Sequence, residues 1–105
     1  MSTQTFMVVA TIREDTDLAA LTSLIPDEMA SVERLREQGK LGSVHVAFAR
    51  RVIFIEAFGA DEADVTATVR SLPMGGFFDL DVYPTAPGGT APGGNAAGGN
   101  AAEAR

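Results

Sequence analysis

The sequence predicts an α+β domain in which two helices pack on one face of a four-stranded antiparallel sheet. Apolar strand-like runs alternate with helical periodicity, in the order strand, helix, strand, strand, helix, strand. Gly or Pro follows each helical stretch. This is the order of the ferredoxin-like split βαβ repeat. The chain of 105 residues is long enough for one small domain, which we place at residues 1–84.

The first half predicts a strand followed by a helix. "TFMVVATIR", residues 5–13, is rich in β-branched and aromatic residues and has no Gly or Pro, which is typical of a buried strand. Apolar residues then recur at steps of three and four, which predicts a helix over residues 17–38 that Gly39 ends. Pro26 either kinks this helix or begins a second helix after a short turn. We favour one kinked helix.

The second half predicts a hairpin, a helix and a last strand. "LGSVHVAF" and "RVIFIEAF" are two apolar runs around a turn centred on Ala49 and Arg50. Asp61 is a suitable N-cap for a helix that ends before Pro73. "FFDLDVY", residues 77–83, alternates as the last strand does.

Residues 85–105 predict a tail. They are rich in Gly, Ala and Pro and repeat in units of five, APGGT, APGGN and AAGGN. Such a segment buries too little apolar surface to offset the entropy of ordering, so we expect it to be flexible. Exchange of this tail between subunits is the alternative.

Composition disfavours several function classes. The formal net charge of -6 argues against nucleic acid and anionic membrane surfaces as partners. The absence of cysteine excludes disulfides, Cys-ligated zinc and thiol catalysis, and a single histidine furnishes a metal site poorly. We therefore expect no metal and no cofactor. No signal peptide and no membrane-spanning run is visible, so we expect a cytoplasmic protein.

The predicted hairpin divides the strand residues between two faces. It places Val44 opposite Ile55 and Val46 opposite Ile53 on the helix face. The other face, which we call the open face, collects polar and apolar side chains together: Ser43, His45, Val52, Phe54, Glu56, Phe58, Phe77, Asp79, Asp81 and Tyr83. An apolar patch of this size predicts a homodimer in which two open faces enclose a partly polar pocket.

Glu56 and His45 are the candidate proton carriers of this inter-sheet pocket. A carboxylate among apolar neighbours suits proton shuttling, although Glu56 could equally pair with Arg13 or Arg51 at an interface. An imidazole suits acid–base work near neutral pH, and the alternative for His45 is a packing contact with a carboxylate.

The remaining candidates assist or contact a substrate. Asp79 and Asp81 are either an acid–base pair or charges that blunt an edge strand; we favour the second role for Asp81 and leave Asp79 open. Tyr83 is either a donor to a carbonyl oxygen or a rim aromatic. Five side chains would contact the substrate: Ser43, Val52, Phe54, Phe58 and Phe77.

Asp27 and Glu28 follow Pro26 and suit the first turn of a helix. We favour capping as their role over a place at the mouth of the pocket.

Two segments carry a family resemblance. "LPMGGFFDLDV" resembles the closing segment of muconolactone isomerases through Leu72, Pro73, Asp79 and Val82. "PDEMASVERLREQG" resembles the first helix of that family, with Asp27-Glu28 at the matching place. The resemblance covers residues 6–83 and implies a dimeric α+β barrel, sometimes assembled into larger rings. It also implies proton transfer α to a lactone carbonyl, which moves a carbon–carbon double bond.

The sequence departs from the family in its first strand. Family members tend to carry a Lys there, whereas this strand has Met7, Val8, Val9 and Ala10 at its centre. We therefore expect a cofactor-independent isomerase or cyclase of secondary metabolism that acts on a small lactone or polyketide-like carbonyl compound. The alternatives are a non-catalytic dimeric binding or assembly module and a cofactor-free monooxygenase of the same superfamily.

Overall fold

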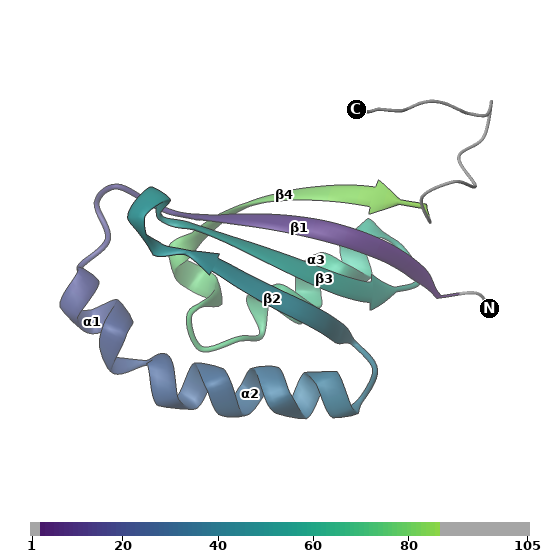
Figure 1. The fold of residues 1–105 in the computed structure, drawn as a ribbon, viewed down its shortest axis with the longest axis horizontal. Helices are drawn as coiled ribbons and strands as arrows, with labels where there is room; N and C mark the ends of the chain where they lie inside the picture. Colours follow the sequence, from purple (N-terminus) through teal and green to yellow (C-terminus); the bar gives the residue numbers. More distant parts are fainter. Residues whose placement is uncertain (1–2, 87–105) are drawn as a thin grey trace.

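The computed structural model describes residues 3–86. One antiparallel sheet has the strand order β2-β3-β1-β4, with strands β1 (Gln4–Ile12), β2 (Leu41–Ala47), β3 (Val52–Gly59) and β4 (Phe78–Thr85). Three α-helices accompany it: α1 (Leu18–Ser23), α2 (Ile25–Glu37) and α3 (Glu62–Arg70) (Figure 1). The predicted α+β, ferredoxin-like fold is confirmed. The predicted tail, apart from residues 85 and 86, lies outside the described residues.

The predicted single helix is in fact two helices. Leu24 separates α1 from α2, and Pro26 lies in the first turn of α2. Proline has no N–H to donate and disfavours helical geometry at the residue before it, so a helix that ran through this point would lose a hydrogen bond. The version with one kinked helix, which we favoured, is therefore wrong, and the alternative with a second helix near Pro26 is correct.

The β2–β3 hairpin has the predicted register but a different turn. Val44 pairs with Ile55 and Val46 with Ile53, as predicted. The chain turns through a 3₁₀-helix, η1 (Phe48–Arg50), and then Arg51 in the left-handed region with φ 59°, instead of a two-residue turn.

The other end of β2 contains an irregularity that the sequence analysis did not predict. The register shifts between Leu41 and Val44, so Gly42 and Ser43 together lie opposite Glu56. This arrangement of two residues against one is a β-bulge.

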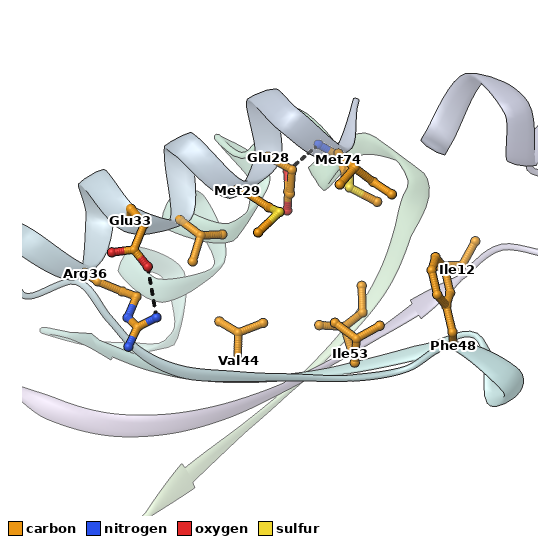
Figure 2. Close-up of a pocket in the computed structure, with 12 residues that line it drawn as sticks. Ile12, Glu28, Met29, Glu33, Arg36, Val44, Phe48, Ile53 and Met74 are labelled. Atoms are coloured by element: carbon orange, nitrogen blue, oxygen red, sulfur yellow. Dashed lines mark hydrogen bonds and ion pairs between the residues drawn. The ribbon is translucent and has the colours of Figure 1, made fainter. Parts of the chain in front are cut away.

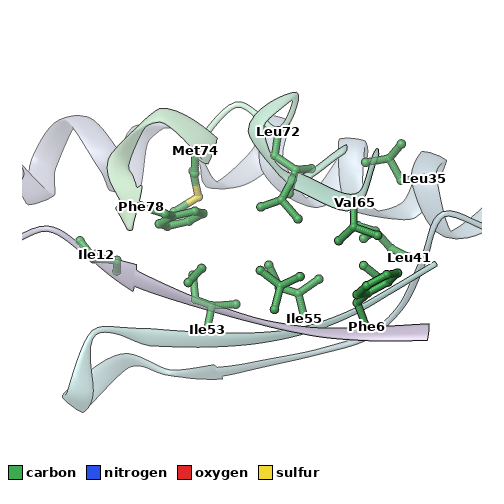
Figure 3. Close-up of a cluster of buried hydrophobic side chains, with 14 of the residues drawn as sticks. Phe6, Ile12, Leu35, Leu41, Ile53, Ile55, Val65, Leu72, Met74 and Phe78 are labelled. Atoms are coloured by element: carbon green, nitrogen blue, oxygen red, sulfur yellow. The ribbon is translucent and has the colours of Figure 1, made fainter. Parts of the chain in front are cut away.

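The core lies between the helices and the inner face of the sheet (Figure 3). Alternate residues of β1 and β3 point into it, as the period of two in a strand requires. The helices contribute Leu35 from α2 and Val65 and Val69 from α3. Asp61 caps α3, as predicted, because its Oδ1 accepts a hydrogen bond from Asp64 N at 2.8 Å.

A second 3₁₀-helix, η2 (Gly75–Phe77), leads into β4. Arg70 Nη1 donates to the carbonyl oxygens of Gly75 at 2.6 Å and Phe78 at 2.8 Å, which fixes this turn. Phe77 therefore lies in η2 and not in the last strand as predicted, and its partly buried side chain packs against the core.

Candidate functional site

A cavity of about 460 Å³ lies between α2 and the β2–β3 half of the sheet. Val44, Val46 and Ile53 form its strand side, and the view in Figure 2 shows Val44 and Ile53 pointing toward α2. The other lining residues come from β1, η1, the α3–β4 loop and α2: Ile12, Phe48, Met74, Ile25, Glu28, Met29, Val32, Glu33 and Arg36. Pockets of this size hold small organic ligands.

The cavity has an exposed apolar rim. Met29 is 65 % exposed, and Val46 and Phe48 are each 56 % exposed, although all three line the cavity. β2 is an edge strand, so no further strand of the described sheet covers Val46. The cavity is therefore open to solvent on the side of β2 and η1, where Val46 and Phe48 are exposed.

Glu28 is the partly buried carboxylate of the cavity wall. Its Oε1 accepts a hydrogen bond from the backbone N–H of Met74 at 2.9 Å. Burial raises the pKa of Glu28, and the hydrogen bond from Met74 acts in the opposite direction. A carboxyl group whose pKa is moved toward neutral pH is better suited to accept a proton and to return it.

Glu33 and Arg36 form an ion pair on the same wall. Arg36 Nη1 lies 3.1 Å from Glu33 Oε2. The side chain of Arg36 is 48 % exposed and that of Glu33 is 65 % exposed. Both residues are exposed, and they also border the cavity, which the sequence analysis did not predict. Glu28, Val32 and Arg36 follow one another at steps of four and so share one side of α2.

The sequence-predicted site residues lie elsewhere, on the open face of the sheet. His45 pairs with Phe54, Met7 with Tyr83, and Thr11 with Asp79 in the strand register. The inward parity of these strands lines the core and the cavity, so the outward parity faces away from both. The strand residues predicted for the open face therefore do lie together on one side of the sheet. That side is opposite the cavity.

Two of the open-face carboxylates have described partners. Glu56 Oε1 accepts hydrogen bonds from Ser43 N at 3.1 Å and from Ser43 Oγ at 3.2 Å, within the β-bulge. Asp79 lies 3.7 Å from Arg13 Nη1, so Arg13 pairs with Asp79 and not with Glu56 as considered above. Apolar and aromatic surface remains exposed there, 41 % of Phe54 and 54 % of Tyr83.

A solved structure shares this arrangement of strands and helices. The crystal structure of muconolactone isomerase superposes with a TM-score of 0.65 and 18 % sequence identity, over 87 % of this chain and 97 % of that chain. The chain has the muconolactone isomerase fold. No family model and no curated protein matches the sequence.

The shared fold of muconolactone isomerase does not assign a role to any residue of this chain. Within residues 3–86, no group of three or more His, Asp or Glu residues is placed to hold a metal ion. No helix in the described part of the chain is long and apolar enough to cross a membrane.

Proposed function

We propose that this chain is a cofactor-independent isomerase or cyclase that moves a proton on a small lactone or polyketide-like substrate in the cavity between α2 and the sheet. The observation that supports this most is Glu28, a partly buried carboxylate with a raised pKa on the wall of a mainly apolar cavity. The fold shared with muconolactone isomerase agrees with this class of chemistry.

In the isomerisation, Glu28 acts first as a base and then as an acid. Its carboxylate removes a proton from the carbon α to the substrate carbonyl, and the electron pair of the C–H bond enters an enolate. The protonated Glu28 then returns the proton to the γ carbon, so the double bond moves and Glu28 is ionised again.

A cyclisation uses the same first step. The enolate carbon attacks a second carbonyl of the same substrate and forms a carbon–carbon bond. Glu28 then donates its proton to the new alkoxide. No electrons are gained or lost in either reaction.

The open face supports a second part of the proposal, a homodimer. Phe54 and Tyr83 are large and exposed on one sheet surface, which is typical of a contact area. In such a dimer Glu56, His45, Asp79 and Tyr83 would face an inter-sheet space, together with Ser43, Val52, Phe54 and Phe58. We assign the proton transfer to Glu28 instead, because Glu28 lines the mainly apolar cavity, whereas Glu56 and Asp79 lie on the opposite side of the sheet.

The test uses α-angelica lactone, an uncharged β,γ-unsaturated lactone, and larger lactones of the same type. Formation of the conjugated isomer is followed by ultraviolet absorbance, and deuterium uptake in D₂O by NMR. Glu28→Gln keeps the side-chain volume and an oxygen that can accept the Met74 N–H, and we expect it to lower kcat about 100-fold or more. Glu56→Gln is the matched control, because it makes the same change on the open face.

The two variants locate the reaction. Loss of activity in Glu56→Gln with full activity in Glu28→Gln would move the site to the open face. A dimer without turnover of any of these lactones would favour the non-catalytic binding module. Oxygen uptake with a quinol substrate would favour the cofactor-free monooxygenase.

A further inference from the structure

We propose that Glu33 makes the cavity selective for uncharged carbonyl compounds. The Glu33 carboxylate pairs with the guanidinium group of Arg36, so this group is not free to bind a carboxylate of a ligand. The carbonyl part of this inference rests on the proposed function. The charge selectivity concerns binding alone and does not depend on turnover.

Within residues 3–86, the ionisable groups that line the cavity leave no free positive charge. Among the described lining residues, the ionisable side chains are Glu28, Glu33 and Arg36. The ion pair between Arg36 and Glu33, at 3.1 Å, is neutral as a unit. The cavity therefore carries one negative charge when Glu28 is ionised and none when Glu28 is protonated. Neither state attracts a ligand carboxylate.

The rest of the wall gives an anion no compensation. Val44, Val46, Ile53 and Phe48 have no polar side-chain atoms, so a carboxylate beside them would lose hydration without gaining a hydrogen bond. The same loss of hydration raises the pKa of Glu28. The net charge of the chain, -6, adds a repulsive background.

The positions of the polar groups along α2 indicate which part of a ligand would lie beside the Glu33–Arg36 pair. Glu28 and Arg36 are eight residues apart in α2, about 12 Å along the helix axis at 1.5 Å per residue. Figure 2 shows the Glu33–Arg36 pair toward one end of the labelled lining residues, and Phe48 and Ile12 toward the other. A substrate whose reacting carbon lies at Glu28 can therefore extend a substituent toward the pair.

An uncharged substituent can be accepted without breaking the pair. A guanidinium group has five N–H donors, and the contact with Glu33 uses the Nη1 end of Arg36. An ester or ketone oxygen can accept one of the remaining N–H groups. A carboxylate at the same place would lie beside Glu33 and be repelled by it.

The experiment compares two probes that share a skeleton and differ in charge, ethyl coumarin-3-carboxylate and coumarin-3-carboxylate, at pH 7.5. Binding is measured by NMR titration, from the methyl signals of Val44, Val46 and Ile53. We expect the ester to bind the wild-type protein at least about tenfold more tightly than the acid. Glu33→Gln should strengthen acid binding about threefold to fivefold, the scale of an exposed ion pair, and change ester binding less than twofold.

Two controls separate the role of Glu33 from a general charge effect. Glu37→Gln makes the same change of net charge at an exposed position of α2 that does not line the cavity, and should leave acid binding unchanged. Adding Arg36→Gln to Glu33→Gln should remove the gain in acid binding.

Three results would overturn the inference: equal binding of acid and ester to the wild type, an equal gain in Glu37→Gln, or no shift of the cavity methyls by the ester at millimolar concentration. Failure of the proposed function is distinguishable, since charge selectivity without any turnover would refute the isomerase and keep this inference. Turnover that depends on Glu28, without charge selectivity, would support the isomerase and refute this inference.

Discussion

The side chain of Glu28 joins α2 to the loop between α3 and β4, because its Oε1 accepts the backbone N–H of Met74 at 2.9 Å. The two residues are 46 positions apart in the sequence. The Met74 side chain is buried and belongs to the core, so this bond connects the cavity wall to the core beneath it. The carboxylate that we assign to proton transfer thus also holds part of its own site in place.

The first prediction concerns the pH dependence of stability. Burial raises the pKa of Glu28 in the folded state above the ordinary value of 4.5. The folded state therefore binds this proton more tightly than the unfolded state does. The stability that this proton contributes is present at acidic pH and is lost as the pH rises through the folded-state pKa. Urea unfolding from pH 4 to pH 8 should show this loss in the wild type relative to Glu28→Gln.

The difference between the two proteins should become constant above that range, where Glu28 is ionised in both the folded and the unfolded state. Glu37→Gln is the control, since Glu37 is exposed on the same helix. A free energy of unfolding that keeps the same wild-type-to-Glu28→Gln difference at every pH would show that Glu28 is not desolvated.

The register of the sheet could be predicted because a strand has a period of two. Once Val46 faces the helices, Ile53 must face them as well, and a slip of one residue would place every apolar side chain in water. The helix break at Pro26 was visible but ambiguous, since proline is compatible with a kink and with a helix start. The turn through η1 could not be derived, because Ala49 and Arg50 carry no turn preference.

The cavity could not be predicted, because periodicity tells which face of α2 is directed toward the sheet and not how far the helix stands from it. Val44, Val46 and Ile53 were correctly placed on the helix face, but no cavity beside them was predicted. Glu28 was considered, and capping was favoured for it. The usable signal was the row formed by Glu28, Val32 and Arg36, in which two charged residues share one side of the helix with the apolar contact positions.

The second prediction concerns the core. The side chain of Phe78 is 0 % exposed, so Phe78→Ala should lower the free energy of unfolding by about 3–5 kcal/mol through lost burial and a new cavity. Phe48→Ala removes the same atoms from a side chain that is 56 % exposed, and should cost clearly less. Chemical denaturation of both variants measures the difference, and equal costs would mean that Phe78 is not a core residue.

The third prediction concerns the start of α3. Asp61 Oδ1 accepts the Asp64 N–H, and its loss leaves a helix-end donor without this partner. Asp61→Ala should therefore destabilise the protein by about 1 kcal/mol. Asp61→Asn keeps an oxygen acceptor and should retain most of the stability. If thermal unfolding shows the same loss for both, charge and not capping is the role of Asp61.

The fourth prediction concerns the β-bulge and the role of Glu56. A Cβ on Gly42 would overlap Oε1 of Glu56, so Gly42→Ala forces the carboxylate away from Ser43. The loss of these hydrogen bonds should cost about 1 kcal/mol in the free energy of unfolding. Glu56→Ala removes the same bonds and the obstacle together.

The double variant Gly42→Ala/Glu56→Ala decides between the two roles of Glu56. If the carboxylate is held by Ser43, each single change destroys the same interaction, so the double variant should be more stable than the sum of the single losses by about 1 kcal/mol. Additive losses would show that Glu56 does not depend on the bulge. In that case its carboxylate is free to face a partner sheet, and proton transfer by Glu56 on the open face would again be a candidate mechanism.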